Sequence, residues 1–80
     1  MQLLVQIATG GYDAWKADFD AHSEDLGQAG LTLMQLWRDA DDSTKAVALF
    51  EAHDRGRAQT WISNQSSLHG GITAQFLRTA

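Results

Sequence analysis

The sequence contains no cysteine and no proline among its 80 residues. Without cysteine the chain can form neither a disulfide bond nor a thiolate metal site, and its three histidines lack the close spacing of helical zinc motifs. No apolar run approaches the roughly 20 residues of a transmembrane helix, and residues 1–8 resemble a strand more than a signal peptide. We therefore expect a cytoplasmic protein that does not span a membrane and needs no metal and no other cofactor.

Positive charge is also scarce in this chain. Six Lys and Arg residues stand against ten Asp and Glu residues, which gives a formal net charge of −4. The basic residues are spread along the sequence, whereas contacts with a phosphate backbone require clustered Lys or Arg side chains. The composition therefore excludes nucleic acid as an expected partner.

Residues 1–80 are expected to form a single domain, since no linker or low-complexity segment divides them. A domain of this size buries only about 60–65% of the surface that its unfolded chain exposes. Small domains usually need a disulfide, a metal or oligomerisation to reach ordinary stability. With the first two excluded by composition, oligomerisation is the remaining route.

The first half of the chain has the apolar pattern of a strand followed by a long helix. In residues 2–8 the apolar side chains alternate, so that Leu3, Val5 and Ile7 share one face. From residue 12 the period changes to steps of three and four, which predicts one helix ending near Gly27 and Gly30. The members of its apolar stripe are Tyr12, Trp15, Phe19, His22 and Leu26.

The second half predicts a hairpin, a helix and a last strand. Residues 31–39 and 44–53 form the hairpin strands, and strict alternation places Leu31 and Trp37 on one face and Leu36 on the other. The Asp and Ser residues of the loop 40–43 favour local side-chain turns. Asp54 is a good N-cap for the helix that carries Ala58 and Trp61, which we expect to end at Gly70 and Gly71. Residues 73–79 form the last strand.

This order of elements predicts an α+β protein with the β-α-β-β-α-β arrangement of ferredoxin-like domains. The expected architecture is a four-stranded antiparallel sheet with two helices on one face. Both faces of the sheet carry large apolar side chains, but the helices can cover only one of them. An uncovered apolar face is an interaction surface, so we expect a homodimer formed through the open face of the sheet.

Several segments together resemble a known superfamily. They are Tyr12-Asp13-Ala14-Trp15-Lys16, Phe19-Asp20, Ala29-Gly30, Trp37-Arg38-Asp39-Ala40-Asp41-Asp42, and Asp54 with Ala58. With these features the chain resembles small uncharacterised members of the dimeric α+β barrel superfamily, which includes antibiotic-biosynthesis monooxygenases and stress-responsive barrel proteins. The resemblance implies a homodimeric barrel with a small-molecule pocket beside the sheet, and it does not imply a reaction.

Three residues are candidates for a ligand site. His22 is the polar member of an otherwise apolar helical stripe, and a buried imidazole there would be a proton acceptor whose pKa is lowered by desolvation. Alternatively, His22 lies at the edge of the stripe, partly solvated and hydrogen-bonded. His53 lies at a strand-to-helix junction, and Trp37 lies late in a strand beside Arg38. No catalytic residue can be assigned from these patterns.

Two classes of function remain open. The first is a non-catalytic binder of a small hydrophobic ligand or of a protein partner, which the shortness of the chain favours. The second is a cofactor-independent monooxygenase or isomerase that acts on a small aromatic or polyketide-like substrate, with His22 as the base and tryptophans as the pocket walls. A cavity that faces His22 and a tryptophan would favour the enzyme.

Overall fold

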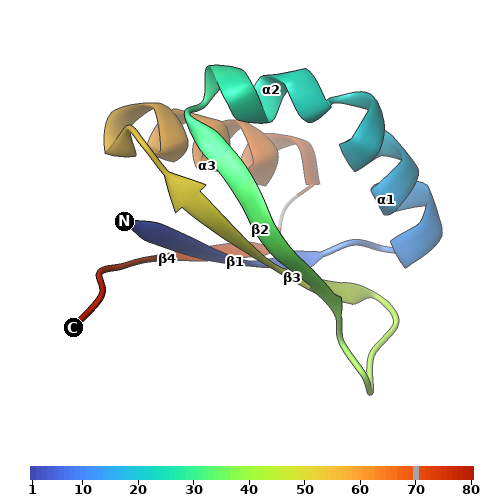
Figure 1. Ribbon diagram of the computed structural model, residues 1–80. Helices are drawn as coiled ribbons and strands as arrows, with labels where there is room; N and C mark the ends of the chain where they lie inside the picture. Colours follow the sequence, from blue (N-terminus) through green and yellow to red (C-terminus); the bar gives the residue numbers. More distant parts are fainter. Residues whose placement is uncertain (70) are drawn as a thin grey trace.

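The computed structural model describes residues 1–69 and 71–80, which form an α+β fold with all helices on one side of a sheet (Figure 1). In chain order the elements are β1 (Gln2–Ala8), α1 (Tyr12–Ala21), α2 (Ser23–Gln28), β2 (Leu31–Arg38), β3 (Lys45–Ala52), α3 (Arg55–His69) and β4 (Ile72–Leu77). Within the described part of the chain, no helix combines the length and apolar character needed to cross a membrane.

The four strands pair in the order β2-β3-β1-β4, and every neighbouring pair is antiparallel. Strands β1 and β2 are separated by β3, and strands β3 and β4 are separated by β1, so each helical connection passes over one intervening strand. This arrangement confirms the predicted four-stranded antiparallel sheet and is compatible with a ferredoxin-like fold.

The core lies between the sheet and the helices. Leu3 and Val5 of β1, which were predicted to share one face, are completely buried, and so is Phe50 of β3. From the helical layer, Trp15 and Trp61 pack onto them, and the ring of Trp61 meets that of Phe50 edge-on at a centroid distance of 5.5 Å. The two tryptophans therefore serve as packing residues over the centre of the sheet.

The predicted single helix over residues 12–26 is wrong, because the chain breaks at His22. His22 has φ −108° and ψ 27°, so α1 ends at Ala21 and α2 begins at Ser23. Glu24 and Asp25 in the first turn of α2 favour a new helix start, since carboxylates stabilise a helix N-terminus. Helix α2 then continues through Gly27, where we expected the helix to close.

The predicted face of Trp37 is also wrong, because β2 contains a bulge. The pairing of β2 with β3 shifts register at Met34. An extra residue in one strand reverses the alternation of the residues that follow it. Leu31 (4% exposed) and Leu36 therefore both face the helices, while Trp37 pairs with Val47 on the open face and is 45% exposed.

Aspartate side chains shape the hairpin turn between β2 and β3, as predicted. Asp39 Oδ1 accepts hydrogen bonds from the backbone N–H groups of Asp41 (2.9 Å) and Asp42 (3.0 Å). Asp42 Oδ1 accepts from the hydroxyl and the backbone N–H of Thr44, at 2.6 and 2.9 Å. The bond from the Thr44 hydroxyl is the main reason that the pKa of Asp42 lies below its usual value.

The helix of the second β-α-β half, α3, begins with the predicted N-cap residue. Asp54 Oδ1 accepts a hydrogen bond at 3.1 Å from the backbone N–H of Arg57, which follows Asp54 by three residues. Helix α3 continues to His69; its predicted end at Gly70 lies outside the described residues. Strand β4 covers Ile72–Leu77, so it starts one residue earlier and ends two residues earlier than predicted.

Candidate ligand-binding groove

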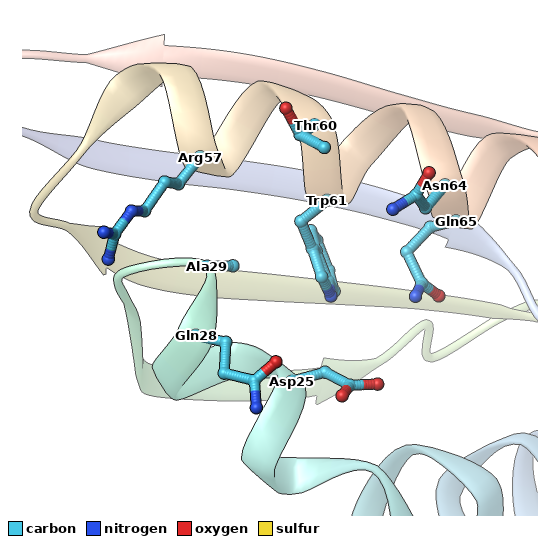
Figure 2. A pocket seen from close by; sticks show the side chains of 8 residues that line it. All are labelled: Asp25, Gln28, Ala29, Arg57, Thr60, Trp61, Asn64 and Gln65. Carbon is cyan, nitrogen blue, oxygen red and sulfur yellow. The ribbon is translucent and has the colours of Figure 1, made fainter.

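A groove with a volume of about 650 Å³ lies between α2 and α3 (Figure 2). One wall consists of side chains on α3, namely Arg57, Thr60, Trp61, Asn64 and Gln65. The facing wall is formed by Asp25 and Gln28 of α2 and by Ala29, which follows it. The side chains of Arg57, Trp61 and Gln65 point from α3 toward α2 in Figure 2.

The spacing along α3 explains why these side chains share one wall. Residues 60 and 61 follow residue 57 by three and four positions, and residues 64 and 65 follow residue 61 by the same spacings, which places all five on one side of the helix. Only Trp61 in this set is apolar. It is 7% exposed, and this exposed part of the side chain forms the floor of the groove. The groove therefore combines a small apolar floor with walls that can form hydrogen bonds.

The two charged side chains of the groove lie toward its opposite ends. Arg57 stands at the start of the row on α3, whereas Asp25 lies farther along the groove, toward Gln65 (Figure 2). Arg57 Nε is 3.8 Å from Asp54 Oδ2, and both side chains are largely exposed. An exposed ion pair of this length contributes little, so it holds the guanidinium only weakly.

A smaller pocket of about 80 Å³ adjoins the groove and brings in His22. It shares Asp25, Trp61 and Gln65 with the groove and continues toward α1. Its remaining lining residues are Trp15, Asp18, Phe19, His22 and Leu26. A histidine therefore does lie beside tryptophans, at the mouth of the smaller pocket.

His22 is solvated and bonded to its own helix. Its side chain is 62% exposed, and Nδ1 lies 2.8 Å from the backbone oxygen of Asp18 and 3.4 Å from Asp18 Oδ1. The hydrogen bond to this carbonyl, followed by the charge of Asp18, raises the pKa of His22 above 6.5. The expected lowering of this pKa by burial is therefore wrong, and the alternative of an edge position with a hydrogen-bonded ring is confirmed.

The other two predicted site residues lie elsewhere. Trp37 is on the open face of the sheet, on the side opposite the helices. His53 follows β3, and its Nε2 is 3.3 Å from the hydroxyl oxygen of Thr32 on β2. The structure therefore does not assemble His22, Trp37 and His53 into one site.

The groove was not predicted from the sequence. Its walls come from α2 and α3, which approach each other only in the folded chain, and no single motif spans them. One feature of the sequence could have indicated the groove: the polar residues Arg57, Asn64 and Gln65 surround the buried Trp61 on the same side of α3.

Among the residues that the structure describes, no group of three or more His, Asp or Glu side chains lies close enough together to hold a metal ion. The chain matches no family model and no curated protein. The fold alone does not identify a superfamily, because one architecture hosts many functions. The resemblance to dimeric α+β barrels thus stays a prediction.

Proposed function

We propose that this protein is a non-catalytic binding protein that holds a small ligand in the groove between α2 and α3. The observation that carries the proposal is the groove itself. Its volume of about 650 Å³ lies within the range of roughly 300–1,000 Å³ that is typical of small-molecule sites. Convergent polar side chains around an apolar floor are the usual means of fixing a ligand's orientation.

The lining revises the kind of ligand that we expected from the sequence. Apart from Ala29 and Trp61, every side chain that lines the groove is polar or charged. Burying such groups against a purely hydrophobic molecule would cost free energy, because their hydrogen bonds to water would be lost. The ligand should therefore have an apolar part for the floor and hydrogen-bonding groups for the walls.

The proposal is tested by NMR spectroscopy of the ¹⁵N-labelled protein with a library of small amphipathic compounds. We expect binders to shift the indole N–H signal of Trp61 and the backbone signals of α2 and α3. Gln28→Trp should fill the groove and abolish these shifts. Gln59→Trp is the matched control, since Gln59 is an exposed α3 residue outside the groove. Shifts that survive Gln28→Trp, or a library without any binder, would refute the groove as a ligand site.

The alternative is a cofactor-independent monooxygenase or isomerase with His22 as its base. The position of His22 beside Trp15 and Phe19 in the smaller pocket favours this alternative. The volume of that pocket, about 80 Å³, opposes it, because an engineered cavity that binds benzene measures about 150 Å³. His22→Phe distinguishes the two: loss of turnover of an aromatic substrate would support the enzyme, whereas unchanged ligand binding in the groove supports the binding protein.

As part of the same proposal, a second copy of the chain covers the open face of the sheet. The pairs Leu4–Leu49 and Val47–Trp37 lie on this face, where Trp37 is exposed and the other three side chains are only partly buried. Lys45 and Glu51 lie on the same face near opposite ends of β3. A two-fold axis across the strands would place each lysine near the partner's glutamate, so the face is complementary to itself. The groove remains open in such a dimer because it lies on the helical side.

A further inference from the structure

The charges at the two ends of the groove point to a more specific ligand. We infer that the groove takes a short zwitterionic peptide of about three residues, with its carboxylate at Arg57 and its ammonium group at Asp25. This inference rests on the proposed function and deepens it. It is supported by the spacing of the charges, by the carboxamides between them and by the position of Trp61.

The spacing between the ends fits three residues. Gln65 follows Arg57 by eight positions on α3, which corresponds to about 12 Å along a helix axis, and Asp25 lies toward the Gln65 end. An extended peptide spans at most about 3.3–3.6 Å per residue, so three residues cover about 10–11 Å. The flexible Arg57 side chain can make up the difference between the length of the peptide and the length of the groove. With this spacing, we expect a single amino acid to be too short to reach both charges.

The carboxamides that line the groove match the chemistry of a peptide backbone. The carboxamides of Gln28, Asn64 and Gln65 each offer a donor and an acceptor. A peptide unit presents one N–H donor and one C=O acceptor, so such side chains can satisfy both. Trp61 lies four residues from each end of the row on α3, where it would contact the side chain of the central peptide residue.

Neighbouring charges modify the polarity of the groove without reversing it. Asp18 lines the adjoining pocket together with Asp25, which makes that end negative, although His22 is within 3.4 Å of Asp18. At the other end Asp54 competes weakly for Arg57 from 3.8 Å. The orientation with the ammonium group at Asp25 therefore places each terminus of the peptide beside a charge of opposite sign.

The test uses the peptide Ala-Phe-Ala in three forms: with free termini, with an acetylated N-terminus and with an amidated C-terminus. Binding is followed by the NMR signal of the Trp61 indole N–H. We expect each block to weaken binding by about tenfold, because each removes one charge-assisted contact. Phenylalanine with free termini should also bind more weakly than the tripeptide, since it cannot reach both ends.

Two variants assign each charge to its partner. In Asp25→Asn, the acetylated peptide should bind as tightly as the peptide with free termini, while the amidated peptide should still bind more weakly. In Arg57→Gln, the amidated peptide should bind as tightly as the peptide with free termini, while the acetylated peptide should still bind more weakly. Glu24→Gln and Arg55→Gln are the controls: Glu24 is an exposed α2 residue outside the groove, and the Arg55 guanidinium lies 4.6 Å from the Phe76 ring on another face of α3. Neither control should change the preference among the three peptides.

The outcomes separate this inference from the proposed function. Equal binding of all three peptides in the groove, or binding of amphipathic library compounds without any peptide, would overturn the zwitterionic ligand and leave the binding protein standing. If neither library compounds nor peptides shift the signals of α2 and α3, the proposed function itself fails. The inference would also be overturned if the peptide with free termini still bound more tightly than both blocked peptides in Asp25→Asn and in Arg57→Gln.

Discussion

His22 shows how one residue can divide a helix. Its imidazole bonds to the carbonyl oxygen of Asp18, one of the last carbonyls of α1, and its backbone conformation lies outside the helical region. A cationic side chain near a helix C-terminus is favourable, because the unpaired carbonyls there carry partial negative charge. The protonated form of His22 therefore stabilises the end of α1.

This interaction predicts a dependence of stability on pH. The pKa of His22 is raised above 6.5 in the folded chain, so its contribution is fully present below about pH 6.5 and is lost as the pH rises through the folded-state value. We expect the free energy of unfolding to fall as the pH rises above about 6.5, and to fall less in His22→Gln. His53 is present in both proteins, so the difference between them isolates His22. An NMR titration that gives His22 a pKa below 6.5 would contradict the prediction.

Gly71 is required by both its backbone angle and its surroundings. It has φ 47°, and a Cβ atom there would lie 2.7 Å from the Cβ of Ala8. We expect Gly71→Ala to reduce the free energy of unfolding by about 1–3 kcal/mol, measured by urea denaturation. Gly10→Ala is the control, since Gly10 has φ 72° but nothing within 4 Å of the added atom. If both substitutions cost the same, the contact with Ala8 has no effect.

At the scale of the element, the stability of α3 depends on its first turn. Asp54 accepts the N–H of Arg57 and so satisfies one of the unpaired donors at the helix start. We expect Asp54→Ala to lower the free energy of unfolding by about 1 kcal/mol, and Asp54→Asn to retain most of the stability because asparagine also caps well. Equal losses in the two variants, measured by urea denaturation, would argue against the cap.

The same substitutions connect α3 to the groove. Asp54→Ala also removes the weak partner of Arg57, so a ligand carboxylate would no longer compete for the guanidinium. Binding of the free-terminus peptide should therefore not weaken in Asp54→Ala as long as the helix is intact.

The elements that could be predicted are those whose signal is local. The alternation in residues 2–8 predicted that Leu3 and Val5 share a face of β1, and Asp54 identified the start of α3. The break at His22 could not be read from periodicity, because the stripe resumes at Leu26 with a spacing that suits a continuous helix. The bulge at Met34 adds one residue without any turn-forming sequence, so strict alternation placed Trp37 on the wrong face.

The site was harder to predict than the fold for a related reason. A groove between two helices depends on how α2 is oriented by the break at His22, and that break was not expected. The sequence left two positions open for His22, buried within the apolar stripe or at its edge with the ring partly solvated. In the structure the His22 ring is exposed to solvent, which avoids the free-energy cost of burying an imidazole.

At the scale of the whole molecule, the two sides of the sheet have different roles. The helical side contains the core and the groove between α2 and α3 (Figures 1 and 2). The open side presents Leu4, Val47, Leu49 and Trp37 without any helix over them. A small chain with a single core gains stability when such a face is buried, which favours association of two copies.

We therefore expect the protein to sediment as a dimer at micromolar concentration, with at least about 1,000 Å² buried in total. Trp37→Lys should shift it to a monomer, because a charge would then face the apolar partner surface. The substitution should leave the monomer folded, since Trp37 lies on an edge strand and is 45% exposed. Ala17→Lys, at an exposed position of α1, is the control and should remain dimeric. A wild-type monomer, or a dimer that survives Trp37→Lys, would show that the open face is not the interface, and circular dichroism would verify that each variant is folded.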